Sequence, residues 1–236
     1  MIPMKPNWQD SPKRSHTEVI EELLEPANAK IIDVGCGAGQ ITRTLTEMGA
    51  EVIGIDPGKR QLERARAAET VGNEIYIEGT AEDLPFEDEA MDIILFFNSF
   101  HHVPRKEFTR AIKESQRVLR PGGKLFFTEP IAEGPQFELS RLINDETEIR
   151  ALAYESILSL PNKGFRAILE VMYITETRHK NFERFRFNST SINPARERIF
   201  EKHNIEIRER FENFSTKDHG YFVFQHPIRG NLFERL

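Results

Sequence analysis

The chain has 236 residues, 30% of them charged, and a formal net charge of -6 at pH 7. This length is enough for one α/β domain with a sizeable core, and the acidic balance argues against a protein that binds nucleic acid over its whole surface. The single cysteine, Cys36, excludes an internal disulfide and favours a reducing compartment such as the cytoplasm. No apolar run reaches the ~18 residues that a membrane span needs, and residues 1–6 lack the apolar core of a signal peptide.

The first half of the chain alternates between strand and helix patterns. Residues 1–10 look irregular, and the apolar stripe after Ser11-Pro12 predicts a helix that ends at Pro26. Strands are then expected at residues 30–34, 51–55, 75–77, 91–97 and 124–128. Helical patterns separate most of these strands. Because strands and helices alternate, the sequence predicts a parallel sheet with right-handed crossovers.

The second half of the chain has a different pattern. Residues 130–193 read as helical and irregular, and this segment is too long for an ordinary connection. A helix is expected at 195–203, followed by a strand at 205–211, where apolar residues alternate. A turn at Lys217-Asp218-His219-Gly220 leads into a strand at 221–225. We expect these last two strands to form an antiparallel hairpin at the edge of the sheet.

The stretch from Asp33 to Gly39, Asp-Val-Gly-Cys-Gly-Ala-Gly, marks the first predicted strand as part of a nucleotide site. A strand that breaks into a glycine turn and opens a helix allows positive φ angles and close approach of a ligand. A dinucleotide fingerprint needs glycine at position 40, where this chain has Gln40. Asp33 would repel a pyrophosphate but suits a cationic sulfonium amino acid. The negative charge of Asp33 therefore favours a sulfonium methyl donor over NAD as the cofactor.

Four stretches in order give this chain its resemblance to a known family: residues 33–39, Gly54-Ile55-Asp56, residues 79–86, and Leu119-Arg120-Pro121-Gly122-Gly123. Each stretch lies at or beside the end of a predicted strand, and the carboxyl edge is where open α/β sheets bind ligands. The layout resembles the class I S-adenosylmethionine-dependent methyltransferases over residues 30–128, and loosely over 195–226.

The resemblance implies a doubly wound, Rossmann-like, seven-stranded and mostly parallel sheet whose last strand is antiparallel. It implies one methyltransferase domain over 1–236, in which residues 1–28 form an N-terminal helical cap. Residues 130–193 would form a helical, substrate-binding lid inserted after strand five.

The resemblance also implies S-adenosylmethionine as the cofactor. Asp33 would accept hydrogen bonds from the ammonium end of the cofactor, and Asp56 would accept them from both ribose hydroxyls. Asp83 would accept from the adenine amino group, while Leu84 would cover the edge of the adenine ring. Each acid also has a plainer interpretation as a cap or turn residue. The implied cofactor residues are Asp33, Gly35, Gly37, Gly39, Asp56, Pro57, Gln61, Ala81, Glu82, Asp83, Leu84 and Asn98.

Candidates for catalysis follow the fourth and fifth strands. His101 and His102 precede Val103, and the pair is similar to that of small-molecule and quinone-type methyltransferases. One histidine would deprotonate a hydroxyl or orient an amine, and the other would cap or pack against the next helix. Glu129 would bind an amine or accept a proton, unless it is a solvated acid. The spacing of His101, His102 and Glu129 does not match that of known metal ligands, so no metal is expected. Cys36 is interpreted as a small loop residue and not as a nucleophile.

The expected reaction is an in-line transfer of a methyl group to an O, N or C nucleophile of a small molecule, anionic or aromatic in character. The interleaved basic and aromatic residues at 178–187 allow contact with RNA or an anionic substrate. The interpretation we favour is an amphipathic strand with Phe185 and Phe187 inward. An RNA methyltransferase, a non-catalytic cofactor-binding protein and an NAD oxidoreductase remain the alternatives. Arg14 would contact the cofactor carboxylate or, as we favour, lie in solvent.

Overall fold

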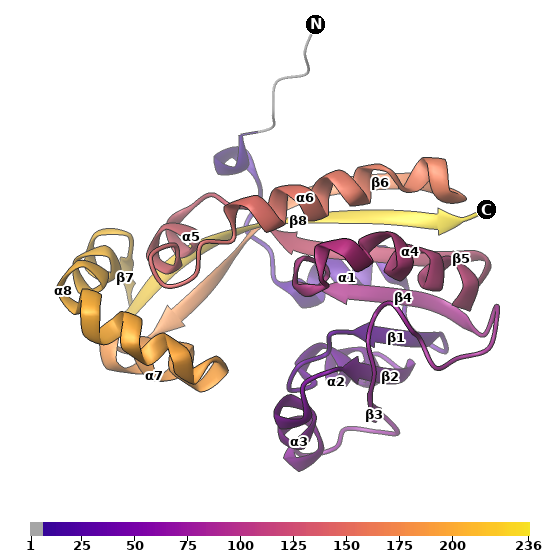
Figure 1. Cartoon of the computed structure of the whole chain (residues 1–236), viewed down its shortest axis with the longest axis horizontal. Helices are drawn as coiled ribbons and strands as arrows, with labels where there is room; N and C mark the ends of the chain where they lie inside the picture. The colour runs from indigo at the N-terminus through magenta and orange to yellow at the C-terminus, as the bar shows by residue number, and fades with distance from the viewer. Residues whose placement is uncertain (1–6) are drawn as a thin grey trace, which may run out of the picture. The chain divides into compact units, whose positions relative to one another are not determined.

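The structure is a computed structural model that describes residues 7–236 (Figure 1). The expectations for residues 1–6, including the absence of a signal peptide, lie outside the described residues. The chain divides into two compact units. Unit 1 combines Met1–Lys13, Pro130–Glu148 and Met172–Ile228, and unit 2 combines Arg14–Glu129, Ile149–Val171 and Arg229–Leu236. Within residues 7–236, no helix has the length and apolar character to cross a bilayer.

The sheet has the strand order β3-β2-β1-β4-β5-β8-β6, and β7 pairs with β8 outside this path. β1 pairs in parallel with both β2 and β4, and β4 pairs in parallel with β5. The arrow of β8 points opposite to that of β5 in Figure 1, so the last long strand is antiparallel to its neighbour. This topology confirms the predicted class I fold. The strands are β1 Lys30–Val34, β2 Glu51–Asp56, β3 Ile75–Glu78, β4 Met91–Phe97, β5 Leu119–Pro130, β6 Phe165–His179, β7 Thr216–Asp218 and β8 Tyr221–Arg235.

The helices connect the strands much as the sequence predicts in the first half of the chain. The α-helices are α1 His16–Leu24, α2 Gln40–Glu47, α3 Lys59–Ala67, α4 Phe108–Val118, α5 Pro135–Ser140, α6 Thr147–Leu158, α7 Phe182–Ile192 and α8 Glu197–Asn213. The 3-10 turns are η1 Trp8–Asp10, η2 Phe100–His102, η3 Arg105–Glu107, η4 Leu160–Lys163 and η5 Pro194–Arg196. Residues 130–193, expected to form one lid, are divided between the two units.

Helix α1 starts later than the Ser11-Pro12 signal indicates. Lys13 forms a parallel bridge with Ile174, and the Pro12 carbonyl accepts a hydrogen bond from the Ile174 N–H, so this segment is extended. The helix instead begins after Ser15, whose hydroxyl and the Glu18 carboxylate form a capping box. Two backbone donors of the first turn are satisfied in this way.

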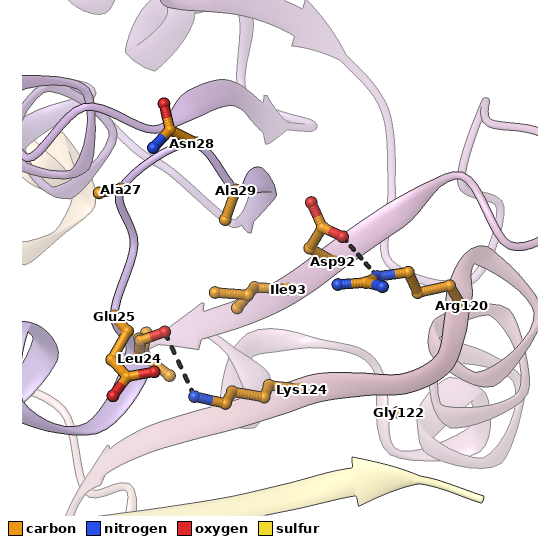
Figure 2. Close-up of a pocket in the computed structure, with 10 residues that line it drawn as sticks. All are labelled: Leu24, Glu25, Ala27, Asn28, Ala29, Asp92, Ile93, Arg120, Gly122 and Lys124. Atoms are coloured by element: carbon orange, nitrogen blue, oxygen red, sulfur yellow. Dashed lines mark hydrogen bonds and ion pairs between the residues drawn. The ribbon is translucent and has the colours of Figure 1, made fainter.

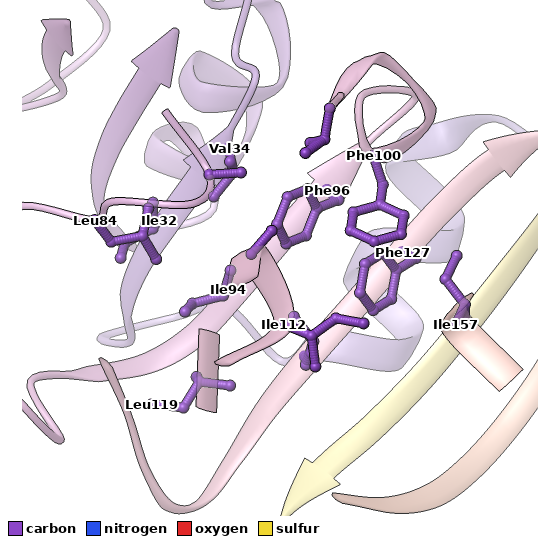
Figure 3. Close-up of a cluster of buried hydrophobic side chains, with 14 of the residues drawn as sticks. Ile32, Val34, Leu84, Ile94, Phe96, Phe100, Ile112, Leu119, Phe127 and Ile157 are labelled. Carbon is purple, nitrogen blue, oxygen red and sulfur yellow. The ribbon is translucent and has the colours of Figure 1, made fainter. Parts of the chain in front are cut away.

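The core of unit 2 explains why the sequence of β4 is almost entirely apolar. Residues 93–96 are buried, as expected for a central strand covered on both faces. On one face, the Phe96 ring lies 5.1 Å from Phe127 and 5.3 Å from Phe100 between ring centroids. Ile112 of α4 and Ile157 of α6 belong to the same cluster (Figure 3). This packing fixes the end of β4 and the loop that follows it.

Two predictions for the second half of the chain are wrong. Residues 205–211 were expected to be a strand, but they lie in α8, because Phe200, Ile207 and Phe211 form a helical stripe at i, i+7 and i+11. All three are buried, whereas Ile205 is 77% exposed. The segment 130–193 was expected to be mainly helical and irregular, yet it contains the whole of the 15-residue strand β6, Phe165–His179.

The expected hairpin exists, but with a different first strand. Thr216 pairs antiparallel with Val223, and the turn at His219 and Gly220 has positive φ at both residues. β8 lies between β5 and β6 in the strand order and therefore is not an edge strand. The amphipathic strand favoured for residues 178–187 is wrong beyond His179, where β6 ends, because α7 begins at Phe182. Phe185 is buried as expected, but Phe187 is 58% exposed.

Unit 1 has its own aromatic core around a buried imidazole. His179 is 6% exposed, and neither ring nitrogen has a hydrogen-bond partner among the described residues. Its ring centroid lies 5.3 Å from Phe185, 5.9 Å from Phe224 and 6.3 Å from Phe211. Burial in this apolar cluster lowers the pKa of His179.

The buried imidazole predicts acid sensitivity. Because the folded state keeps His179 neutral, the unfolded state binds more protons once the pH falls below the ordinary histidine pKa of 6.5. The free energy of unfolding should therefore fall between pH 6.5 and the lowered pKa. His179→Phe should reduce this loss in denaturant titrations at several pH values. His219→Asn removes an exposed imidazole from a residue with positive φ and should leave the loss unchanged. Equal acid sensitivity of His179→Phe and the parent chain would contradict the prediction.

Candidate functional site

All the predicted cofactor residues lie in unit 2, around the carboxyl ends of three neighbouring parallel strands. β1 ends at Val34, β2 at Asp56 and β4 at Phe97. Since parallel strands end at the same edge of a sheet, the loops that follow them converge there. Three of the four sequence motifs thus meet in space as expected. The fourth, residues 119–123, lies at the opposite edge of the sheet, because Leu119 pairs with Met91, the first residue of β4.

The glycine loop after β1 is held by the end of β2. The Ile55 carbonyl accepts hydrogen bonds from the N–H groups of Gly35 at 2.7 Å and Cys36 at 3.0 Å. The Asp56 carboxylate accepts one bond from the Gly37 N–H at 2.9 Å and one from the Gly58 N–H at 2.7 Å. Each Asp56 oxygen retains a lone pair, so the carboxylate can still accept hydroxyl donors.

Three glycines of this loop have positive φ, but for different reasons. A Cβ on Gly35 would lie 2.5 Å from the Ser99 Cβ, and one on Gly39 would lie 2.5 Å from the Tyr76 hydroxyl. A Cβ on Gly37 would have no heavy atom within 4 Å. Packing inside the protein therefore requires Gly35 and Gly39, whereas Gly37 faces open space that a ligand can enter.

Asp33 is a buried acid with an incomplete set of hydrogen bonds. It is 1% exposed, and its Oδ2 accepts a hydrogen bond from the Thr42 hydroxyl at 2.7 Å. Its Oδ1 has no partner among the described residues. Burial, assisted by the negative charge of Asp56, raises the pKa of Asp33 to about 6. A cationic group at Oδ1 would relieve both the missing bond and the unfavourable charge.

Asn98 directly follows β4 and has a backbone conformation that is uncommon for a residue with a side chain. Its φ is 51°, its N–H donates to the Thr128 carbonyl at 2.7 Å, and its Oδ1 lacks a partner among the residues described. The next residue, Ser99, donates its hydroxyl to the Val34 carbonyl at 2.5 Å. The loops after β1 and β4 are therefore tied together directly beside Gly35.

The loop at residues 79–86 presents some of the predicted side chains and buries others. Asp83 is exposed and Glu82 is half-buried. Ala81 and Leu84 are buried in the hydrophobic core, and the expected cover of an adenine ring by the Leu84 side chain stays a prediction. The Leu84 N–H donates to Glu114 at 3.0 Å, and its carbonyl accepts from Arg117 at 2.9 Å. On the β2 side, Pro57 is exposed and Gln61 half-buried.

His101 and Glu129 form a buried pair. The Glu129 carboxylate bonds to the His101 Nδ1 through one oxygen and accepts the Phe100 N–H at 2.8 Å through the other. His101 is 4% exposed, whereas His102 is exposed, with its ring centroid 4.0 Å from that of His101. Glu129 is therefore not the solvated acid of the plainer interpretation. The pair is arranged so that a carboxylate orients an imidazole.

Two other candidates have structural roles. Cys36 is buried, and burial raises the pKa of its thiol, which keeps it protonated and unreactive. Arg14 precedes α1, pairs with Glu22 and donates to the Glu18 carbonyl at 3.3 Å, both on that helix. Its side chain is half-buried, so the favoured interpretation of Arg14 as a solvated helix arginine is wrong.

Two depressions in unit 2, of about 290 and 750 Å³, lie at the opposite edge of the sheet. The larger is lined by Lys30, Glu51, Ile75 and Met91, the first residues of β1 to β4. Figure 2 shows the smaller, where Asp92 pairs with Arg120 and Lys124 reaches the Leu24 carbonyl. No predicted site residue lines either depression, so the candidate site does not coincide with them.

Comparison with known proteins agrees with this geometry. Residues 32–127 match the model of a family described as a methyltransferase domain. A 108-residue stretch is 39% identical to an uncharacterized methyltransferase of Mycobacterium tuberculosis, covering 46% of this chain and 42% of that protein. A ubiquinone biosynthesis O-methyltransferase of Aliivibrio fischeri is 35% identical over 131 residues, covering 52% and 53%.

A solved structure extends the similarity of fold to almost the whole chain. The crystal structure of a putative S-adenosylmethionine-dependent methyltransferase from Listeria monocytogenes superposes with a TM-score of 0.54 at 15% identity, covering 93% of this chain and 96% of that one. By contrast, the alignments to the two curated relatives span about half of their lengths. Residues 32–127 thus match a methyltransferase domain, and the strand order of the sheet is that of the class I methyltransferase fold.

Proposed function

We propose that this protein is an enzyme that transfers a methyl group from S-adenosylmethionine to a small molecule, using the carboxyl edge of β1, β2 and β4. The observation that carries the proposal is the buried Asp33, whose Oδ1 lacks a partner. Gly37, four residues later, faces open space. A buried acid with a vacant acceptor fits a cationic amino-acid end, and a loop without a side chain fits close approach of the cofactor.

The residues of this edge would hold the cofactor as follows. Asp33 accepts from the ammonium, and Asp56 keeps the glycine loop in place while its free lone pairs accept the ribose hydroxyls. Asp83, which is exposed, accepts from the adenine amino group. Asn98 offers its unpartnered Oδ1 at the amino-acid end. The remaining contacts at the rim come from Pro57, Gln61, Ala81, Glu82 and the backbone of Leu84. When bound, S-adenosylmethionine supplies a methyl group on a sulfonium, already activated for displacement.

His101 is the general base in this proposal. Glu129 holds the Nδ1 of His101, and the second ring nitrogen, Nε2, is the proton acceptor in this proposal. The same carboxylate accepts the Phe100 N–H, so the pair is anchored to the loop after β4. Burial of His101 keeps competing water away from the imidazole. A hydroxyl acceptor would lose its proton to this nitrogen as its oxygen attacks the methyl group.

A small-molecule acceptor is supported better than RNA. The rings of Phe182 and Phe185 are buried in unit 1 and are not available to stack on bases. Arg178 pairs with Asp218, and Arg186 pairs with Glu197, so two of the basic side chains of this stretch already have acidic partners. The ubiquinone relative is named as an O-methyltransferase. The role of residues 130–193 as a substrate-binding lid stays a prediction.

The open face of Gly37 gives a test of cofactor binding. Gly37→Ala places a methyl group in the space assigned to the cofactor, and we expect S-adenosylhomocysteine to bind about 1–3 kcal/mol more weakly in isothermal titration. Gly122→Ala is the matched control, because Gly122 also has positive φ and free space around its Cβ but lies at the opposite edge. Both variants should lose about 1–2 kcal/mol of stability from the left-handed backbone.

Only Gly37→Ala should change the affinity. Equal affinities for the two variants would remove the glycine loop from the cofactor site. Absence of binding by the parent chain would overturn the proposed function itself.

A second test concerns the base. With tritiated S-adenosylmethionine and a panel of small phenols, His101→Ala should lower the rate of transfer by about 10²- to 10⁴-fold, because the proton acceptor is lost. Affinity for S-adenosylhomocysteine should be unchanged. Glu129→Gln should give a smaller loss, since the imidazole remains but loses its anionic partner. His219→Asn, remote on the β7–β8 turn of unit 1, should retain the parent rate. A His101→Ala variant with full activity would exclude His101 as the base.

A further inference from the structure

The pairing of β5 with β8 brings an arginine beside the His101–Glu129 pair. The Ile131 N–H donates to the Pro227 carbonyl at 3.1 Å, which sets the antiparallel register of these two strands. Two residues inward from this bond, Glu129 lies opposite Arg229. Residues opposite each other in an antiparallel pair have Cα atoms about 5 Å apart. Arg229 is therefore a close neighbour of the carboxylate that holds the proposed base.

The side chains of Glu129 and Arg229 point to the same face of the sheet. Phe127, two residues before Glu129, has its ring centroid 6.3 Å from that of Phe233, four residues after Arg229. Because side chains alternate along a strand, residues an even number of positions apart share a face. Helix α6 covers this face through Ile157, which belongs to the same core cluster as Phe127 (Figure 3).

The guanidinium of Arg229 is held in place but forms no hydrogen bond with any residue that the structure describes. Its central carbon lies 3.7 Å from the centroid of the Tyr154 ring on α6. Its Nε lies 3.7 Å from the Glu170 Oε1, which is an ion pair but beyond hydrogen-bond distance. This Nε is buried, while the side chain as a whole keeps 20% of its surface exposed.

The two neighbours of Arg229 are fixed by bonds of their own. The Glu170 Oε2 accepts a hydrogen bond from the Tyr154 hydroxyl at 2.9 Å and another from the Asn231 Nδ2 at 2.8 Å. Burial, assisted by the bond to Glu170, raises the pKa of Tyr154, so its hydroxyl remains a donor. Asn231 is itself 4% exposed. The ring and the carboxylate therefore position the guanidinium, and the N–H donors of Arg229 remain for a further partner.

A carboxylate is the partner that fits these donors. The N–H groups of a guanidinium form a planar fork that matches the two oxygens of a carboxylate. A mostly buried cation with unmade hydrogen bonds is unfavourable, and an anionic ligand would supply both the bonds and a compensating charge. In the strand order, β8 lies beyond β5, whereas the predicted cofactor residues follow β1, β2 and β4. The carboxylate is thus expected on the methyl acceptor.

We propose that Arg229 binds a carboxylate of the methyl acceptor, which makes the substrate class a small acid with a nucleophilic hydroxyl. This inference rests on the proposed function and deepens it by naming the acceptor. Glu129 bonds to His101 and lies opposite Arg229, so one small molecule can reach both the imidazole and the guanidinium. Arg229 touches the end of the acceptor that does not react, and it therefore determines specificity without taking part in the transfer.

The test compares acceptor analogues that differ in charge but hardly in shape. Binding of 3-hydroxybenzoate, 4-hydroxybenzoate and the two matching hydroxybenzamides is measured by ligand-observed NMR titration, with the chain saturated with S-adenosylhomocysteine. The parent chain should bind at least one acid more tightly than its amide. Arg229→Gln should weaken binding of that acid by about 10- to 100-fold, as expected for lost hydrogen bonds between charged groups. Its affinity for the amide should not change, and Arg229→Lys should recover part of the loss because the charge remains.

Arg166→Gln is the matched control. Arg166 also lies on β6 in unit 2, but it pairs with Glu234 at 2.6 Å and its side chain is 61% exposed. This variant should keep the parent affinities for acid and amide. Thermal unfolding of each variant without ligand separates loss of binding from loss of folding.

The outcomes distinguish this inference from the function on which it rests. A parent chain that does not bind S-adenosylhomocysteine would overturn the proposed function and the inference together. If the parent binds S-adenosylhomocysteine but prefers neither acid over its amide, the assignment of Arg229 is overturned while the function stands. Equal losses of acid and amide binding in Arg229→Gln would make the role of Arg229 structural, and an equal loss of acid binding in Arg166→Gln would make the effect one of surface charge. Either result would also overturn the assignment.

Discussion

Asp56 accepts hydrogen bonds from the glycine loop and from the turn that begins α3, and the shape of the candidate site depends on this arrangement. The Ile55 carbonyl adds two more bonds from the same loop. Four backbone N–H groups are thus satisfied by the last two residues of β2. These four hydrogen bonds fix the backbone of the loop through contacts within the protein, so part of the loss of its conformational freedom is included in the free energy of folding.

The glycines allow this shape, because the loop adopts positive φ three times within five residues. Ser99 fills the space beside Gly35, and the Tyr76 ring fills the space beside Gly39. Only the middle glycine faces outward. The same short stretch therefore packs tightly against the protein on two sides and remains open on the third.

Asp33 brings an unfavourable charge into this rigid frame. Its burial raises its pKa to about 6, and only Thr42 donates to it. A raised carboxyl pKa means that ionisation of Asp33 in the folded chain reduces stability as the pH rises toward neutral. A bound cationic ligand would compensate the negative charge of Asp33, and the free energy recovered in this way would add to the affinity for the ligand. The buried Asp33, with only one hydrogen-bond donor, thus lowers the stability of the folded chain by itself and favours the binding of a cationic ligand.

The two faces of the sheet carry different groups at its carboxyl edge. The end of β5 supplies Glu129, which holds His101 after β4, while the opposite face of the same edge carries Thr128 and the first turn of α1. Adjacent residues of β5 thereby point to opposite faces of the sheet. The alternation of side chains along β5 thus places the Glu129 carboxylate beside His101 on one face and the Thr128 hydroxyl on the other.

The strands of unit 2 could be predicted from the sequence because their signals are local. The apolar run from Met91 to Phe97 matches β4, and the order of motifs brings Asp33, Asp56 and Asn98 to one edge of a parallel sheet. In the second half of the chain, local signals were ambiguous. The alternation at 205–211 fits a strand, but Ile207 and Phe211 also fit a helix, and packing against Phe200 decides for the helix.

By itself, the sequence determined which residues follow which strands, because strand and glycine-turn patterns depend on neighbours along the chain. It also determined the excess of acids at the strand ends, which favours a cationic ligand. Tertiary structure alone decided that the Leu84 side chain is buried in the core, that Glu129 holds His101, and that His16 lies beside Phe97. Those outcomes depend on contacts between residues far apart in the chain, and no local periodicity encodes them.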